Sequence, residues 1–449
     1  MEKSTKFASL EYDSQEKLYI LSINDNGYNN ISIGDIYKEC NDSEVFSKGE
    51  NEKIIIHKPI KIKWNNECKN IKIDFQHCEF KDRAYFTNCE FNGNVFFNHA
   101  IFHKYADFHE SIFNGIVSFY NATFNSAPNF STCVFSNLQG ANFINVKIDS
   151  LDFDSVEDFI KEHKNDKTYY EELELLREKY NKRAKKLKLF KANCQQESKK
   201  YRENKQKLHS KYQGFKQELT KKHKIRYANN ARDSFRTIKN VLIANNNLLD
   251  ASNWHKLELY AKEQEIILQN PKRFSKDWCD KIQLWFYRHT SAHHTDLLES
   301  IKSLLIVVGI FGVLNVVVLV GFALYGSFWD SNPHNLIKYY NEYIKCFLVE
   351  HYFIALAINF VLFVVFVGIF VLTIICQKIR NIAFWLFCVI AFLILITSPK
   401  YLIPPIEIFT DKRMLLDPLS VVGGVYSILF GFMLYSFIKT ARKNSIIPN

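Results

Sequence analysis

Phenylalanine recurs at a fixed spacing between residues 80 and 135. One set stands eleven residues apart, and a second set lies between its members. Two residues before each stands a small or slim residue such as Ala, Cys, Ser or Val, so a small-x-Phe unit repeats at alternating steps of five and six residues. A short repeat with one large and one small inward residue predicts a solenoid whose coils bury Phe on Phe. The two sets are Phe80, Phe91, Phe102, Phe113, Phe124 and Phe135, and Phe86, Phe97, Phe108, Phe119 and Phe130.

Some units carry a further signature, namely Ala106-Asp107-Phe108, Pro128-Asn129-Phe130 and Ala141-Asn142-Phe143. They resemble the pentapeptide-repeat unit Ala-(Asp/Asn)-(Leu/Phe)-x-x, and the chain resembles the Phe-centred subgroup of membrane-anchored pentapeptide-repeat proteins. The resemblance covers residues 71–153 and implies a right-handed, four-sided β-helix. The six-residue steps, and the eight-residue step from Phe135 to Phe143, depart from the simplest form and imply bulged corners. The alternative is a generic Phe-rich β domain.

Long uncharged stretches follow in the last third of the chain. Leu304–Tyr325 and Tyr352–Cys376 each suffice to cross a hydrocarbon core of about 30 Å. Ile382–Thr397 and Val421–Ile438 are shorter but also uncharged. We predict an α-helical transmembrane bundle of about four helices, at 303–325, 352–376, 382–397 and 420–438. Buried helices of a soluble core are the alternative, and it is weakest for the first two.

The basic residues that flank these stretches predict an orientation. The Gln377–Arg380 loop and the Lys439–Lys443 tail are positively charged, and positive loops stay in the cytoplasm. The polar Met1–Asn30 opening does not have the pattern of a signal peptide. We therefore expect a multi-pass protein of the cytoplasmic (inner) membrane with both termini in the cytoplasm and the lipid bilayer as a partner.

Charge is unevenly spread along the chain. Between Ser155 and Arg226 there are 22 Lys+Arg against 11 Asp+Glu, which equals the whole formal excess of +11. The repeat segment is only slightly acidic, which argues against the DNA-mimic role known in the family. The basic stretch has no groove-reading motif, so we do not expect nucleic acid as a partner. A solvated helix that faces the anionic inner leaflet explains the charge more simply.

The pattern predicts five regions. They are an N-terminal β cap (1–53), the β-helix (54–155), a basic helical neck (156–227), a helix-turn-helix linker with a juxtamembrane collar (228–300) and the transmembrane domain (301–449). In the neck, the spacing of Leu173, Leu176 and Tyr180 suits a coiled coil, but Lys205 and Ser198 break the heptad. A coiled coil in part and a helical hairpin that packs on itself are both open.

One cluster could carry chemistry. His289 and His293 are spaced as one helical turn, with His294 and Asp296 close by, and two imidazoles at that spacing can share a metal ion. The Glu of a His-Glu-x-x-His site is missing, and no distant third ligand is evident. We expect a His-rich collar rather than a metal site. The sequence shows no phosphate-binding Gly loop, nucleophile elbow or catalytic dyad, so we expect no cofactor and no enzyme.

Small and polar residues mark the membrane helices. Gly423, Ser427 and Gly431 repeat every four residues, which predicts a face for close helix packing or oligomer contacts. Asn315 and Asn359 fall in mid-helix, where an amide serves as interhelical glue or faces a pore. No Thr-Val-Gly-Tyr-Gly filter is present, so the channel role of some family members is not carried over to any residue.

Two functions fit these features. The first is an oligomeric channel-like or membrane-permeabilising protein regulated by its cytoplasmic region, which requires a homo-oligomer with Asn315 or Asn359 on a wet path. The second is a membrane-anchored scaffold whose β-helix docks a cytoplasmic protein partner, with no transport activity. Four helices are more than an anchor needs, so we expect the first, although the absent filter and the missing ring of charged pore residues favour the second.

Overall fold

The computed structural model describes residues 7–23, 30–50, 53–64, 71–193, 198–327, 350–397 and 418–444. It divides into two compact units, Met1–Ile282 (unit 1) and Gln283–Asn449 (unit 2). Each unit is described by itself below.

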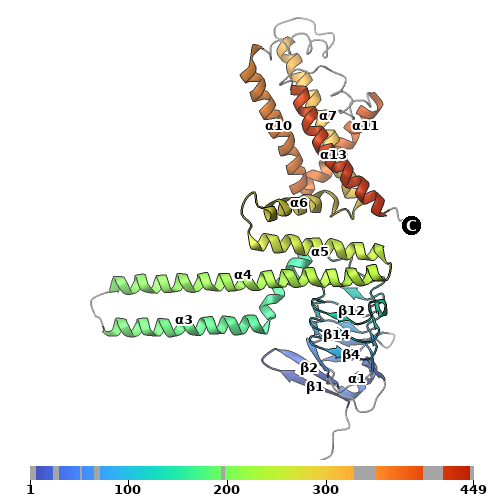
Figure 1. The fold of residues 1–449 in the computed structure, drawn as a ribbon, viewed down its shortest axis with the longest axis vertical. Helices are drawn as coiled ribbons and strands as arrows, with labels where there is room; N and C mark the ends of the chain where they lie inside the picture. The colour runs from blue at the N-terminus through green and yellow to red at the C-terminus, as the bar shows by residue number, and fades with distance from the viewer. Residues whose placement is uncertain are drawn as a thin grey trace, which may run out of the picture. The chain divides into compact units, whose positions relative to one another are not determined.

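Unit 1 is built on a β-solenoid of about four turns. Its strands form four parallel stacks, and successive strands of the chain pass from one stack to the next (Figure 1). In the regular coils the partners within a stack are 22 residues apart, as in Glu79↔Ile101 and Ile101↔Thr123, whereas Val117 pairs with Ala141, 24 positions later. The solenoid strands are β7 (Lys72–Asp74), β8 (Glu79–Phe80), β9 (Ala84–Tyr85), β10 (Glu90–Phe91), β11 (Val95–Phe96), β12 (Ile101–Phe102), β13 (Ala106–Asp107), β14 (Ile112–Phe113), β15 (Val117–Ser118), β16 (Thr123–Phe124), β17 (Val134–Phe135) and β18 (Ala141–Asn142). The predicted solenoid and its four sides are confirmed, while its right-handed sense stays a prediction.

The two phenylalanine sets of the sequence become four columns. Because one coil takes 22 residues, each ring stacks on the ring 22 positions away rather than on its neighbour in the sequence. Phe86, Phe108 and Phe130 stack at centroid distances of 4.8 and 4.5 Å, and they are fully buried. Rings of adjacent columns meet edge to face, as Phe97 meets Phe108 at 5.6 Å. The core is therefore an array of aromatic pairs, which favour these two geometries.

The alternating steps correspond to two kinds of corner. A five-residue step closes in a β-turn, in which the Ala100 N–H donates to the Phe97 carbonyl at 3.1 Å and His99 has a φ of 58°. A left-handed third residue is what a type II turn requires. The six-residue step makes a wider bend. In the eight-residue step, the extra residues form the 3-10 helix η2 (Leu138–Gly140). The left-handed corner residues are His77, Asn88, His99, Glu110, Asn121, Thr132 and Asn145.

A test of the coil spacing is the substitution Gly115→Ala. A Cβ at Gly115 would lie 2.4 Å from the carbonyl oxygen of Gly93 in the adjacent coil. Because the obstacle is backbone, we expect unit 1 to lose about 1–3 kcal/mol of unfolding free energy, as overpacked cores do. Gly214→Ala is the matched control, since nothing lies within 4 Å of its Cβ in helix α4. That control should gain up to about 1 kcal/mol. Equal urea midpoints for both variants would contradict the packing described here.

The first coil of unit 1 contains longer strands. β1 (Ala8–Asp13) and β2 (Leu18–Ile23) form an antiparallel hairpin, and β2 continues one stack through β6 (Ile60–Trp64). The other elements are β3 (Asn30–Ser32), α1 (Ile33–Cys40), β4 (Phe46–Lys48) and β5 (Ile54–Ile56). Ser32 and Asp35 form a capping box at the start of α1, whose Ile33 and Ile36 are buried. The 1–53 segment is thus rich in β-structure and joins the solenoid stacks.

Helices cover the last coil of the solenoid (Figure 1). They are α2 (Phe153–Lys161), the C-terminal part of α4 (Ser198–Ala244) and α5 (Leu248–Gln269). Phe235 on α4 and Trp254 on α5 belong to one buried core with the solenoid phenylalanines. The module that the sequence predicted as a linker therefore closes an open sheet end, which would otherwise present unpaired backbone groups.

The neck is a helical hairpin. The 3-10 helix η3 (Glu162–Asn165) leads into α3 (Lys167–Asn193), which lies beside the N-terminal part of α4 (Figure 1). Tyr180 and Tyr212 meet across the hairpin at a centroid distance of 4.5 Å. Of the two alternatives, the hairpin is what the described residues show, and coiled-coil character stays a prediction.

Unit 2 is a group of packed helices. They are α7 (Leu297–Ser327), α10 (Tyr352–Ile375), α11 (Gln377–Thr397) and α13 (Pro418–Asn444), and α6 (Lys276–Ser291) leads into them across the unit boundary. Among the described residues, three segments are long and apolar enough to cross a membrane: Leu297–Val318, Tyr352–Ile375 and Val421–Arg442. The predicted span at 382–397 lies in α11, which is not one of these three. The composition fits a membrane-associated protein, and the four-helix span count stays a prediction.

Candidate functional site

The polar side chains buried in unit 2 gather at one end of its helices, and we call this group the collar. It begins where α6 ends at Ser291 and the chain reverses into α7. Ala292, His293 and His294 all adopt the left-handed region, with φ values of 46°, 56° and 64°. The Ser291 hydroxyl accepts a hydrogen bond from the His294 N–H at 3.2 Å. Side chains with a Cβ are strained in this region, so the turn is held by its surroundings.

Hydroxyl groups join α7 to its neighbours in the collar. The His294 Nδ1 lies 3.0 Å from the Ser436 hydroxyl on α13. The Ser300 hydroxyl on α7 lies 3.2 Å from that of Thr440, which is one turn beyond Ser436 on α13. The Ser303 hydroxyl donates to the Thr290 carbonyl of α6 at 2.9 Å. All of these side chains are buried, and their hydrogen bonds satisfy groups that are costly to bury alone.

A charged group completes the collar. Arg380, at the start of α11, is only 5% exposed and forms an ion pair with Glu299 on α7. Its guanidinium also donates to the His289 carbonyl at 2.6 Å, and Lys302 reaches Glu299 at 2.8 Å. The pair therefore ties α6, α7 and α11 together. The basic 377–380 segment, which the sequence predicted as a loop that indicates the orientation, is the first turn of α11 and contributes this structural cation.

The His289–His293 pair does not share a helix face, which corrects the expected one-turn spacing. α6 ends at Ser291, and His293 lies in the left-handed turn beyond it. His289 Nδ1 lies 2.7 Å from the Trp285 carbonyl instead. Burial lowers the pKa of His289, its hydrogen bond to Trp285 opposes this, and Arg288 and Arg380 lower it further. Among the described residues, no three His, Cys, Asp or Glu side chains are arranged to hold a metal ion.

The predicted packing and pore residues are dispersed in unit 2. The Asn315 amide donates to the Phe311 carbonyl of its own helix at 3.0 Å, and Asn359 is 5% exposed. Gly423 is buried, Ser427 is half-buried and Gly431 is exposed, with open space around the position of its missing Cβ. The small-residue face is therefore partly used within the unit and partly free.

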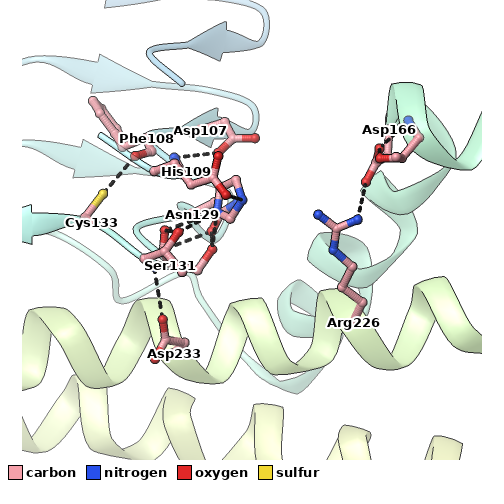
Figure 2. Close-up of polar contacts among 12 residues, drawn as sticks. Asp107, Phe108, His109, Asn129, Ser131, Cys133, Asp166, Arg226 and Asp233 are labelled. Atoms are coloured by element: carbon pink, nitrogen blue, oxygen red, sulfur yellow. Dashed lines mark hydrogen bonds and ion pairs between the residues drawn. The ribbon is translucent and has the colours of Figure 1, made fainter. Parts of the chain in front are cut away.

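In unit 1, side chains of α4 and of Asn245, which follows it, pair with the backbone of the last coil. The Ser234 hydroxyl accepts from the Phe130 N–H and donates to the Pro128 carbonyl, both at 2.8 Å. Asp233 accepts from the Thr132 N–H at 3.0 Å, and Asn245 donates to the Ala141 carbonyl at 2.8 Å. Figure 2 shows Asp233 on its helix reaching the coil. These bonds replace the ones that a further coil would have made.

A polar network lies on the same coils (Figure 2). Asp107 accepts from the His109 N–H at 3.0 Å, and the His109 Nδ1 lies 2.8 Å from the Ser131 hydroxyl. Ser131 in turn donates to Asn129 at 2.6 Å. The three residue types match a catalytic triad, but the geometry does not. A triad requires the carboxylate to orient the imidazole, whereas here Asp107 binds backbone.

Two carboxyl groups of unit 1, on the half-buried Asp107 and the buried Glu258, differ in pKa. Burial raises the pKa of Asp107 to about 6, although the His109 N–H and imidazole oppose the shift. Burial would also raise the pKa of Glu258 on α5, but hydrogen bonds from His255, Lys239 and Arg236 outweigh it and lower the pKa to about 2. Asp107 therefore titrates in a window well separated from that of Glu258.

A pH experiment follows from Asp107. Its folded pKa lies above the ordinary value of 3.8, so the folded unit binds more protons than the unfolded chain between about pH 4 and 6. Its contribution to stability therefore falls as the pH rises through that window. We expect Asp107→Asn to flatten this decline and to gain about 1–3 kcal/mol of unfolding free energy at pH 7. Asp149→Asn, at an exposed position, should change neither. Urea titrations of the parent protein and both variants at several pH values measure this. If the unfolding free energy of Asp107→Asn depends on pH as that of the parent does, the prediction is contradicted.

The comparison with protein families agrees with the repeat. The model of the family described as pentapeptide repeats (9 copies) matches residues 72–112. The repeat segment is therefore a pentapeptide-repeat solenoid. No curated protein and no solved structure matches the chain. Nothing in these comparisons bears on the helices that follow.

Sequence reasoning missed two groups described above. The Asp107, His109, Asn129 and Ser131 network could have been found from the 22-residue coil, because 107 and 129, like 109 and 131, share a position in adjacent coils. The Glu299–Arg380 pair had only a weak signal, which is one acid and one base at the ends of apolar segments. Which charges at such ends would meet depends on helix packing, and the sequence does not show it.

Proposed function

We propose that the protein is a membrane-anchored scaffold, in which unit 2 holds the chain in a bilayer and the solenoid of unit 1 docks a cytoplasmic protein partner. The proposal gives unit 2 no transport role. The basic residues that flank the membrane helices predict that unit 1 and both termini lie on the cytoplasmic side.

The observation that carries this proposal is the apolar interior of unit 2. The Phe311 and Tyr426 rings stack at 4.1 Å, and a Cβ at Gly309 would lie 2.2 Å from Phe387, so α7 packs tightly on both α13 and α11. Among the described residues, the buried polar side chains outside the collar are Asn359 and Thr373, and the Thr373 hydroxyl donates to the Phe370 carbonyl of its own helix. Such an interior offers no continuous set of polar groups that could replace the hydration of an ion.

The solenoid suits a docking role because its ends are occupied while the sides that carry Tyr120 and Val134 are open. The side at Tyr105 is covered by Phe159 of α2. Helices α4 and α5 cover one end, and the first coil with α1 closes the other. The sides carry different chemistry. Tyr120 and Ile144 occupy equivalent positions in adjacent coils and are 39% and 36% exposed, whereas Glu79 on another side is surrounded by Lys53, Lys81 and His103. A solenoid whose sides differ in chemistry can bind one partner in a single position and orientation.

Crosslinking before and after exchange of the membrane anchor tests the scaffold proposal. A photo-crosslinking residue replaces either Tyr120, on one side of the solenoid, or Val134, on another side, in cells that express the full chain. We expect a discrete protein adduct from one side only, and the same adduct when residues 283–449 are replaced by an unrelated membrane anchor. Loss of the adduct on exchange, with the protein still at the membrane, would contradict the proposal.

An oligomeric channel-like or membrane-permeabilising protein is the second candidate. The exposed Gly431 and half-buried Ser427 favour it, because a free small-residue face allows another copy to approach closely. A pore would then form between protomers, and Asn315, half-buried, could face it. The substitution Gly431→Leu separates the candidates, since it should abolish a pore-forming oligomer but leave the scaffold adduct unchanged.

A further inference from the structure

The net positive charge of the neck lies at one end of its hairpin. Residues 179–211 carry 13 Lys+Arg and two Asp+Glu, whereas the flanking residues 155–178 and 212–226 carry nine of each. This segment contains the C-terminal end of α3 and the N-terminal end of α4. It is the end of the hairpin at which the chain passes from one arm to the other. We call residues 179–211 the hairpin tip, and its net charge equals that of the whole chain.

The base of the hairpin is internally neutralised. Glu172 on α3 forms an ion pair with Lys222 on α4 and lies within hydrogen-bond distance of the His223 Nε2 on the same helix, both at 3.2 Å. Asp166 faces Arg226 at 3.8 Å, as Figure 2 shows. The acids of the base thus help to hold the two arms together, and its surface has no excess of either sign.

The hairpin tip has no such compensation. Its described cations are all exposed, and none of them forms an ion pair with another described residue; they are Lys179, Lys182, Arg183, Lys185, Lys186, Lys188, Arg202, Lys205, Lys207 and Lys211. Like charges this close repel one another, so they destabilise the free hairpin. An external anionic surface would relieve that repulsion.

We propose that the hairpin tip binds the anionic headgroups of a lipid bilayer, as a second membrane contact independent of the apolar helices. Eleven of the 13 cations are lysines, which act as point charges, whereas bidentate reading of bases and phosphates favours arginine. Leu189, 67% exposed among them, offers an apolar side chain to the interface. Anchoring by the apolar helices of the same chain would make binding of the tip to that bilayer intramolecular, which raises the effective concentration of lipid.

Each Lys or Arg near an anionic bilayer contributes about 1 kcal/mol, and salt screens the attraction. Binding by the tip is therefore expected to depend steeply on the fraction of anionic lipid and on ionic strength. It needs no particular headgroup beyond negative charge. The inference does not depend on whether the solenoid docks a partner.

Hydrogen exchange on the full chain in lipid nanodiscs tests this. Nanodiscs of phosphatidylcholine alone are compared with nanodiscs containing phosphatidylserine. In the anionic discs we expect exchange across residues 179–211 to slow at least several-fold, and high salt should reverse it. The triple variant Lys182→Glu, Lys185→Glu, Lys186→Glu should lose the slowing. The matched control Lys48→Glu, Lys58→Glu, Lys216→Glu, with the same change in net charge at exposed sites outside the tip, should keep it.

Three results would overturn the proposal. The first is equal exchange in both kinds of disc, and the second is loss of the slowing in the control as well. The third is a tip that ignores anionic lipid but binds single-stranded RNA or duplex DNA added to neutral discs, with the triple variant weakened. That outcome would assign the tip to nucleic acid.

Discussion

Replacing Phe108 with alanine is expected to destabilise unit 1 by about 3–5 kcal/mol, the range for deleting a buried aromatic ring. Phe108 has no exposed surface and stacks on Phe86 and Phe130 at 4.8 and 4.5 Å. It also meets Phe97 and Phe119 edge to face. The cavity would lie in the middle of a column with rings on both sides, where the solenoid is poorly able to collapse.

The control for this substitution is Phe215→Ala on α4, where the ring is 53% exposed. Urea unfolding of the full chain in detergent, followed through the circular dichroism of unit 1, measures both variants. We expect the midpoint to fall for Phe108→Ala and to stay within error for Phe215→Ala. A small loss for Phe108→Ala, comparable with that of the control, would contradict the column arrangement.

The second large effect is expected at Arg380 in the collar. Removing one partner of a buried ion pair costs about 3–5 kcal/mol when the other charge is left without compensation. Arg380→Ala would leave Glu299 with Lys302 as its remaining ion partner and would remove the donor to the His289 carbonyl, so we expect a loss toward the lower end of that range. We expect a large drop in the unfolding free energy of unit 2 in detergent. Lys378→Ala, two residues earlier in α11 and exposed, is the control and should have little effect.

A double-mutant cycle sharpens the Arg380 prediction. If the ion pair is the source of the loss, the combination of Arg380→Met and Glu299→Gln should be less destabilising than the sum of the two single variants. Additive losses would mean that Arg380 acts through its packing or its bond to His289, and that the ion pair does not hold the collar together.

The solenoid could be predicted from sequence because its signal is local and repeated. The same small-x-Phe pattern at each corner specifies the same inward side chains, so many weak preferences agree. The 22-residue coil was less evident, because the eleven-residue spacing alone does not say how many columns exist. Only the pairing of Ile101 with Glu79 and Thr123 shows that the two sets become four columns.

The helical parts were less predictable because their contacts are distant in sequence. Ser234 and Asp233 cap a coil about a hundred residues earlier, and nothing in their own helix indicates this. The His289–His293 spacing suggested a shared helix face, but α6 ends at Ser291 and a strained turn follows. Helix ends depend on tertiary contacts, in this case the bonds of the collar.

Flux measurement on the full chain in liposomes tests the central claim that unit 2 anchors without conducting. Protein that is shown to be inserted and folded is recorded over a range of pH and voltage, alongside an Asn315→Leu, Asn359→Leu variant and a known channel as positive control. The scaffold account predicts flux no greater than in protein-free liposomes for both forms. A reproducible conductance that the asparagine substitutions alter would contradict it and would place a pore beside those residues.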